Sequence, residues 1–142
     1  TGKKRNFVDP SLAIAALRAS EQDLLADFHT FGLIFESLAL RDLQVYAQSL
    51  DGDLFYYRDK NGLECDAIIH LTDGKWGAIE IKLGADQTTI DKAAENLLKF
   101  SEIVDVEQMK EPSCLMILSG ISSYAYRRPD GVLVVPIGCL RD

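Results

Sequence analysis

The sequence is poor in residues that break or bridge a chain, since its 142 residues include four Pro, three Cys and one Trp. No apolar run approaches the roughly 20 residues that a membrane-spanning helix needs. The N-terminus also lacks the basic start and apolar stretch of a signal peptide. With 47% hydrophobic residues, the composition is typical of a globular protein. We therefore expect a soluble, cytoplasmic protein with a single domain over residues 1–142.

The three cysteines are too few and too far apart for a cysteine-based site. Cys65, Cys114 and Cys139 are odd in number, lie in apolar stretches and form no CxxC pair. A disulfide framework and a cysteine zinc site are therefore both disfavoured. We expect reduced thiols in the core.

The chain also lacks a phosphate-binding loop and an excess of basic residues. The chain has no GxxxxGK[ST] motif, which excludes it as a P-loop ATPase by itself. Its net charge of -7 argues against binding of nucleic acid by this domain alone, because nonspecific binding depends on Lys and Arg displacing counterions. The chain also begins TGKKRNF, without an initiator Met. We expect a fragment of a longer protein.

Hydrophobic periodicity predicts one α/β domain. Apolar residues at three- and four-residue steps indicate helices, and alternating or short apolar runs bounded by Gly-containing turns indicate strands. Two turns, 59–62 and 72–74, join three consecutive strands into an antiparallel meander. The fold class is then a central mixed β-sheet flanked by helices. The predicted elements are helices 9–19 and 23–50, strands 54–59, 63–71 and 75–83, helix 87–104, and strands 113–118 and 132–137.

The segment 122–130 separates the last two predicted strands and carries an aromatic and basic group. It contains Tyr124, Tyr126, Arg127 and Arg128. Aromatic and basic side chains together can contact nucleic acid. A solvated loop or edge ribbon is the alternative interpretation, and the sequence favours it.

Strand alternation assigns side chains to the two faces of the predicted sheet. In the strand 63–71, Asp66 shares a face with Ile68, while Cys65 and Ala67 share the opposite face. In each of the second and third strands, one face is wholly apolar and the other becomes acidic.

A hairpin centred near Asp73 brings two of these acids together. Asp66 lies seven residues before Asp73 and Glu80 lies seven residues after it, so they are predicted to face each other across the strands. Directly opposed carboxylates repel by some tenths to about 1 kcal/mol. A divalent cation would offset that cost, since Mg²⁺ binds one or two carboxylates together with water and phosphate oxygens.

Lys82 follows Glu80 by two residues and therefore points to the same face. A lysine there can orient an attacking water or stabilise charge developing on a phosphate. The alternative interpretation of the ExK tripeptide is a solvated face with a weak ion pair. Both interpretations stay open on spacing alone.

Two stretches together resemble a known family. They are FGLIFESLAL at 31–40 and LFYYRDKNGLECDAIIHLTDGKWGAIEIKLG at 54–84. The chain resembles the C-terminal domain of unknown function that follows an AAA+ ATPase module in many bacterial and archaeal proteins. That domain is similar to PD-(D/E)xK nucleases, which implies a restriction-endonuclease-like core with the order α-β-β-β-α-β-β.

The resemblance also implies roles for four residues. Glu36 in GLIFES takes the first acidic position, Asp66 in ECDAII the second, and Glu80 with Lys82 in IEIK the signature pair. Glu36, Asp66 and Glu80 would bind Mg²⁺ or Mn²⁺, and Lys82 would position or activate water. The chain departs from the pattern in having no Pro before Asp66.

Two functions follow as expectations from these residues and the resemblance. The first is a metal-dependent deoxyribonuclease domain attached to an AAA+ ATPase, with DNA as its substrate and ATP bound only in the missing N-terminal module. The second is a noncatalytic module of the same fold that contacts DNA, binds a partner or forms a homo-oligomer. The acidic balance of the chain motivates the second.

Overall fold

The computed structural model describes residues 7–104 and 107–141. Its helices are α1 (Pro10–Leu17), α2 (Glu21–Ala26), α3 (Phe28–Ser49) and α4 (Gln87–Ile103). Pro10 occupies the first turn of α1, and Asp9 caps it. Within the described residues, no helix combines the length and the apolar character needed to cross a membrane.

The single helix predicted over 23–50 is wrong, because the chain leaves the helical conformation at Asp27. The Asp27 side chain accepts a hydrogen bond from the backbone N–H of Thr30 at 3.2 Å and another from its hydroxyl at 2.6 Å. A short acidic side chain that bonds to nearby backbone in this way favours a helix start over a helix interior. Ser20 and Asp23 form a capping box that starts α2 separately.

In the described residues, six strands form one mixed sheet, which confirms the predicted mixed sheet flanked by helices. The order across the sheet is β1-β2-β3-β4-β6-β5. The first three strands are antiparallel neighbours, as the meander predicts, whereas β3, β4 and β6 run parallel. The strands are β1 (Gly52–Arg58), β2 (Glu64–Leu71), β3 (Trp76–Lys82), β4 (Cys114–Ser119), β5 (Tyr126–Arg127) and β6 (Leu133–Pro136), and β6 leads into the 3₁₀ helix η1 (Ile137–Cys139).

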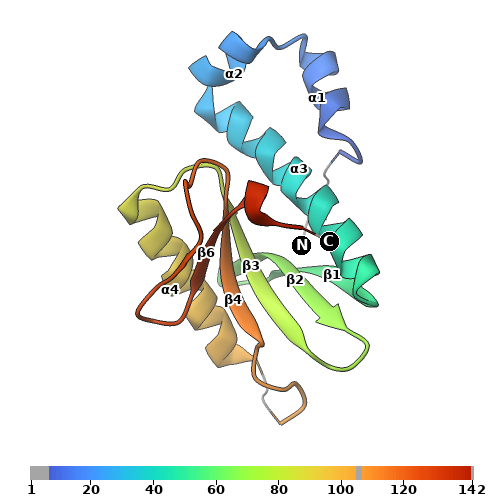
Figure 1. The fold of residues 1–142 in the computed structure, drawn as a ribbon, viewed down its shortest axis with the longest axis vertical. Coiled ribbons are helices and arrows are strands. Elements are labelled where there is room, and N and C mark those ends of the chain that lie inside the picture. The colour runs from blue at the N-terminus through green and yellow to red at the C-terminus, as the bar shows by residue number, and fades with distance from the viewer. Residues whose placement is uncertain (1–6, 105–106, 142) are drawn as a thin grey trace.

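The two long helices cover opposite faces of this sheet (Figure 1). On one face, α4 buries Leu97 and Phe100 against Trp76 and Ala78. On the other face, α3 packs against a second apolar cluster that includes Ile79. Burying both faces explains why the central strand β3 is almost continuously apolar. Only Glu80, buried, and Lys82, half-buried, interrupt that pattern.

An irregularity in β2 changes the predicted assignment of side chains to faces. Phe55 pairs with Ile68 and Tyr57 pairs with Cys65, so one residue of β1 opposes two residues of β2, Asp66 and Ala67. A β-bulge of this kind breaks the alternation of side chains. Cys65 therefore joins the apolar cluster on the α4 side, while Ala67 joins the one on the α3 side. The prediction that these two residues share a face is wrong.

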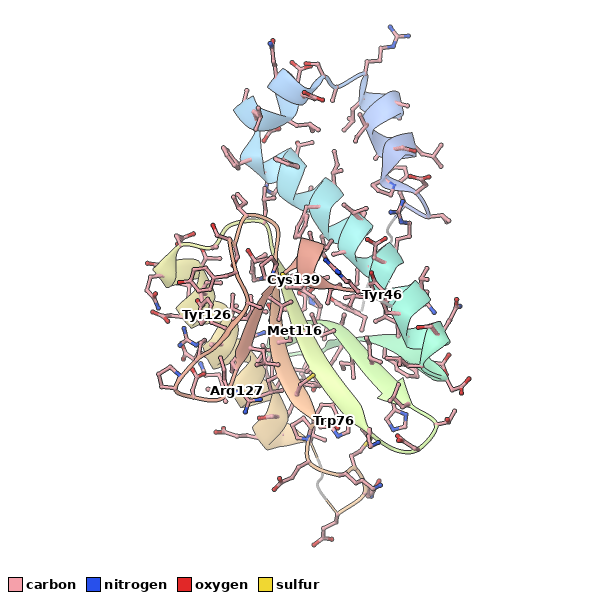
Figure 2. All side chains as sticks on the ribbon, viewed as in Figure 1. Tyr46, Trp76, Met116, Tyr126, Arg127 and Cys139 are labelled. Atoms are coloured by element: carbon pink, nitrogen blue, oxygen red, sulfur yellow. The ribbon has the colours of Figure 1, made fainter. Side chains whose placement is uncertain are left out.

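The cysteines are free thiols, as expected, but they are not all in the core. Cys65 is buried, Cys114 is half-buried and Cys139 is exposed. Cys139 ends η1, which follows β6 and crosses the end of the sheet near Tyr46 of α3 (Figure 2). The prediction of a core thiol is wrong for Cys139. The strand β6 ends at Pro136, so the last residues of this apolar run lie outside the sheet.

The aromatic and basic segment forms the edge of the sheet. Tyr126 and Arg127 make the short strand β5 beside β6, and Tyr124 packs against Tyr126. The neighbouring Arg128 forms ion pairs with Asp91 of α4 at 2.7 Å and with Asp130 at 3.0 Å. The edge ribbon that the sequence favours is confirmed, and the charge of Arg128 is neutralised within the chain.

Candidate functional site

Asp66 and Glu80 are neighbours at the end of the β2–β3 hairpin. The paired register runs from His70 with Trp76 to Ala67 with Ile79, so Asp66 and Glu80 stand at the next position. Backbone pairing stops there, and the Oδ2 atom of Asp66 accepts a hydrogen bond from the Ile81 N–H at 2.9 Å. The Asp66 side chain thus takes the place of a backbone acceptor. Its carboxylate is fixed against β3.

Lys82 joins the two carboxylates. Its Nζ atom lies 3.0 Å from Glu80 Oε2 and 3.8 Å from Asp66 Oδ2. Burial alone would lower the pKa of Lys82, but attraction to Glu80, Asp66 and Glu36 and the hydrogen bond to Glu80 outweigh it. The pKa of Lys82 therefore lies above its ordinary value. Lys82 stays a cation at neutral pH and is not a proton acceptor.

Glu80 is the most buried acid of the group, with 4% of its surface exposed. Burial raises the pKa of Glu80, and the nearby charge of Asp66 raises it further. Lys82 and Asn96 act in the opposite direction without cancelling the effect. Ionising Glu80 therefore costs more free energy in the folded chain than in the unfolded chain.

A polar cavity of about 390 Å³ contains all four residues that the sequence singles out. Glu36 reaches it from α3, Asp66 from β2, and Glu80 and Lys82 from β3. Its remaining lining residues are Gly62, Glu64, Lys92, Ala93 and Asn96. The predicted convergence of Glu36 with the hairpin residues is thus seen in the structure, across elements that are distant in sequence.

Asn96 is a member of the site that the sequence interpretation missed. Its side-chain Nδ2 donates hydrogen bonds to Glu80 Oε1 at 2.9 Å and to the Glu64 carbonyl oxygen at 2.6 Å. It therefore ties α4 to both strands of the hairpin. A signal exists in the sequence, because Asn96 is a polar residue between Ala93 and Leu97 on the buried side of α4. Helical periodicity alone does not say what such a residue touches.

Replacing Asn96 with Ala is expected to destabilise the domain by about 1–3 kcal/mol, because the buried Glu80 carboxylate and the Glu64 carbonyl each lose a donor. Urea unfolding followed by circular dichroism measures this change. Glu95→Ala is the matched control, since Glu95 lies next to Asn96 but pairs only with Lys99 on the surface of α4. Equal midpoints for the two variants would contradict the bridging role of Asn96.

Cys65 lies beside the acidic group but is unsuited to nucleophilic chemistry. Burial, together with the negative charge of Glu80, raises its pKa to about 12. Its Sγ atom lies 3.4 Å from the Ala67 carbonyl oxygen. Because the thiolate is the reactive form of cysteine, this thiol is a packing residue.

The acids of the cavity do not form a preassembled metal cage. Within residues 7–104 and 107–141, no group of three or more His, Cys, Asp or Glu side chains is arranged to hold a metal ion. What the structure brings together is narrower, namely the Asp66 and Glu80 carboxylates with Lys82 between them. Binding of Mg²⁺ or Mn²⁺ by Glu36, Asp66 and Glu80 stays a prediction.

Comparison with protein families identifies the domain. Residues 31–140 match the family described as "Domain of unknown function (DUF4143)". The chain belongs to this family. The matched range begins in α3 and extends beyond β6, so it includes every residue of the polar cavity and the whole sheet.

Other comparisons add little to this assignment. No curated protein matches the chain. A solved structure with a similar chain is a half-complex from a tetradecameric assembly of Thermococcus gammatolerans McrB AAA+ hexamers with bound McrC. The identity is 11% and the TM-score 0.48, and the match covers 74% of this chain and 27% of that one. The chain therefore spans about a quarter of the length of that protein chain.

Proposed function

We propose that this DUF4143 domain is a metal-dependent nuclease domain that hydrolyses phosphodiester bonds of DNA. The observation that carries the proposal is the convergence of Asp66, Glu80 and Lys82 in one polar cavity, with the Lys82 ammonium 3.0 Å and 3.8 Å from the two carboxylates. The two carboxylates can hold a metal ion that assists phosphodiester hydrolysis, and the lysine cation can stabilise charge that develops on a phosphate.

The donor set suits a hard divalent cation. Carboxylate oxygens favour Mg²⁺ and Mn²⁺ over softer metals, and Mg²⁺ keeps several water ligands when only one or two carboxylates bind it. Asp66 and Glu80 would hold the ion, with Glu36 at the third acidic position of the cavity. When bound, the ion would supply Lewis-acid polarisation of a phosphoryl oxygen and a more acidic water.

The side chains of this domain have separable tasks in the proposed reaction. Lys82 remains protonated, so it donates hydrogen bonds and offsets negative charge developing on a phosphate oxygen. The Ile81 N–H fixes Asp66, and Asn96 fixes Glu80. Asn96 is therefore a positioning residue, because it acts through Glu80. Lys92, also at the cavity wall, provides a second positive charge for a substrate phosphate.

We also propose that the domain acts within a longer protein, on the C-terminal side of an AAA+ ATPase module that binds ATP. The sequence resemblance of residues 31–40 and 54–84 supports this arrangement. In it, the ATPase would bring the nucleic acid to a domain whose own net charge of -7 provides little attraction for a phosphate backbone.

Cleavage of labelled DNA in the presence of Mg²⁺ or Mn²⁺ tests the proposed function. The 142-residue chain is expected to cut labelled DNA oligonucleotides only when metal is present, and excess EDTA should stop the reaction. Lys82→Met should reduce the rate by about 10²–10³-fold. Asp66→Asn should also do so, although Asn keeps an acceptor for the Ile81 N–H.

Lys75→Met is the matched control for loss of a lysine. Lys75 pairs with Asp73 at 2.9 Å in the exposed β2–β3 turn, at the opposite end of the hairpin. This variant should retain the full rate. Cleavage that survives in Lys82→Met, or that proceeds in EDTA, would overturn the proposal.

One observation favours a noncatalytic module as a second candidate. Both oxygens of the Glu80 carboxylate already have partners within the chain, since Oε2 contacts Lys82 and Oε1 accepts from Asn96. An ion pair satisfied in this way can be purely structural. Isothermal titration with Mn²⁺ separates the candidates, because a structural ion pair predicts no binding heat and no difference between the chain and its Glu80→Ala variant.

A further inference from the structure

A second cavity adjoins the polar cavity, and Asp66 lines both of them. The second cavity has a volume of about 420 Å³, within the range of roughly 300–1,000 Å³ that is usual for ligand pockets. It lies between α3, β1 and the segment before α1, from which Phe7 and Val8 line it. Leu40, Arg41 and Gln44 line it from α3, and Leu54, Phe55 and Tyr56 line it from β1.

The walls of this cavity match the chemistry of a nucleobase. Phe55 is 52% exposed and Tyr56 is 37% exposed, so accessible aromatic surface lies at the cavity. Aromatic side chains hold bases by stacking, with little dependence on sequence. Leu40 and Leu54 add apolar wall, and the Gln44 side-chain amide carries a donor and an acceptor suited to a base edge.

The bulge in β2 connects this cavity to the proposed reaction site. Tyr56 is the single residue of β1 that opposes both Asp66 and Ala67. An aromatic ring of the second cavity is therefore carried by the backbone position that faces Asp66. A nucleotide with its phosphate at Lys82 has room for a neighbouring base on the β1 side of Asp66.

The charge of the domain indicates how a nucleic acid strand would have to be held. The net charge is -7, and Arg41, the basic residue at the second cavity, lies 3.0 Å from Asp42 and 3.8 Å from Asp9. The described residues that line this cavity therefore offer little positive charge to displace counterions from phosphates, which is the usual source of nonspecific affinity. Stacking on Phe55 and Tyr56 is the alternative source of binding free energy.

We propose that the cavity between α3 and β1 binds an unpaired base of single-stranded DNA, next to the phosphate that is cleaved. The placement of that phosphate rests on the proposed function. A base in an intact duplex is paired and stacked on its neighbours, so it cannot enter such a cavity without being extruded. The domain is therefore specific for single-stranded or unpaired substrate.

Fluorescence anisotropy of three labelled probes tests the inference on the unmodified chain. The probes are a single-stranded oligothymidine, an oligomer of the same length and charge made of abasic spacers, and a matched duplex, each in EDTA, which keeps the proposed cleavage from consuming the probe. We expect oligothymidine to bind at least about tenfold more tightly than either other probe. Its affinity should fall only weakly with salt, because few phosphate contacts contribute.

Substitutions at the cavity locate the effect. Tyr56→Ala should lower the oligothymidine affinity about tenfold, whereas Tyr56→Phe should retain most of it because the ring is kept. Tyr124→Ala is the matched control, since Tyr124 is an exposed aromatic residue that packs near β5, remote from α3 and β1. Circular dichroism melting checks that each variant folds, and the comparison of probes needs no variant.

Equal affinity for oligothymidine and the abasic oligomer would overturn the inference, as would an absence of oligothymidine binding. These outcomes are distinguishable from failure of the proposed function. If the chain cleaves DNA but shows no preference for bases, the inference of a base-binding cavity is wrong and the nuclease proposal is retained. If the chain binds bases, loses this binding in Tyr56→Ala and never cleaves DNA, the nuclease proposal is wrong and the base-binding cavity is retained.

Discussion

Replacing Glu80 with Gln is expected to reduce the rate of metal-dependent cleavage by about 100-fold or more, while changing the stability of the domain by no more than about 1 kcal/mol. The physical reason is the environment of the carboxylate. Glu80 is buried beside Asp66, and its raised pKa means that the folded state disfavours its charged form even with Lys82 and Asn96 in place. A neutral amide of the same shape removes that cost, but it has a single acceptor oxygen for the two donors Lys82 and Asn96, so the two effects offset each other.

The same shift fixes the sign of the pH dependence. A group whose pKa is raised on folding favours the folded state most when it is protonated, and this contribution is lost as the pH rises through the folded-state pKa. The unmodified chain should therefore lose stability over that interval relative to Glu80→Gln. Urea unfolding at a series of pH values, from acid to neutral, measures the difference between the two proteins.

Lys82→Met removes the positive charge of the same ion pair. The raised pKa of Lys82 means that the folded state favours its positive charge, so removing that charge should lower stability at neutral pH. A loss of activity in both variants, with a clear loss of stability only in Lys82→Met, separates chemistry from misfolding. If Glu80→Gln proved as destabilising as Lys82→Met, the interpretation of Glu80 as a costly buried charge would be wrong.

Phe100→Ala is expected to destabilise the domain by about 3–5 kcal/mol, because it opens a cavity in a packed core. Phe100 is 3% exposed and joins α4 to the sheet. Its ring lies 5.0 Å from that of Tyr57 and 6.2 Å from that of Trp76, measured between centroids. Trp76 is the only tryptophan of the chain, so its fluorescence follows the loss directly in urea titrations.

Two further substitutions test the cause of that loss. Phe100→Leu keeps most of the apolar volume and should cost well under half as much. Phe28→Ala removes the same side chain from a position that is 59% exposed at the start of α3 and should leave stability within about 0.5 kcal/mol. Similar losses at positions 28 and 100 would mean that burial against Trp76 is not the source of the stability.

The hairpin residues could be predicted from sequence because strand geometry and turn length act together. A two-residue period and a short Gly-containing turn fix which side chains face each other, and this placed Asp66 beside Glu80. Lys82 followed from the same period. The approach of Glu36 from α3 depended on the family resemblance, since periodicity within one helix carries no information about which strand it meets.

What the sequence could not predict depends on local competition and on packing between distant elements. The break at Asp27 comes from one side chain that accepts a hydrogen bond from the Thr30 backbone. The hydrophobic periodicity continues across this break and therefore does not reveal it. The bulge shifts pairing with β1 by a single residue, and no turn or breaker residue marks it. The contact of Asn96 with Glu80 arises only when α4 docks on the sheet.

The bulge also bears on how this domain tolerates changes in length. The strand β2 contains one residue more than regular pairing with β1 requires. Deleting Ala67 would restore regular alternation with β1 but would move Asp66 one step along β3, away from Glu80 and Lys82. A one-residue deletion at position 67 would therefore dismantle the acidic pair even if the sheet reformed.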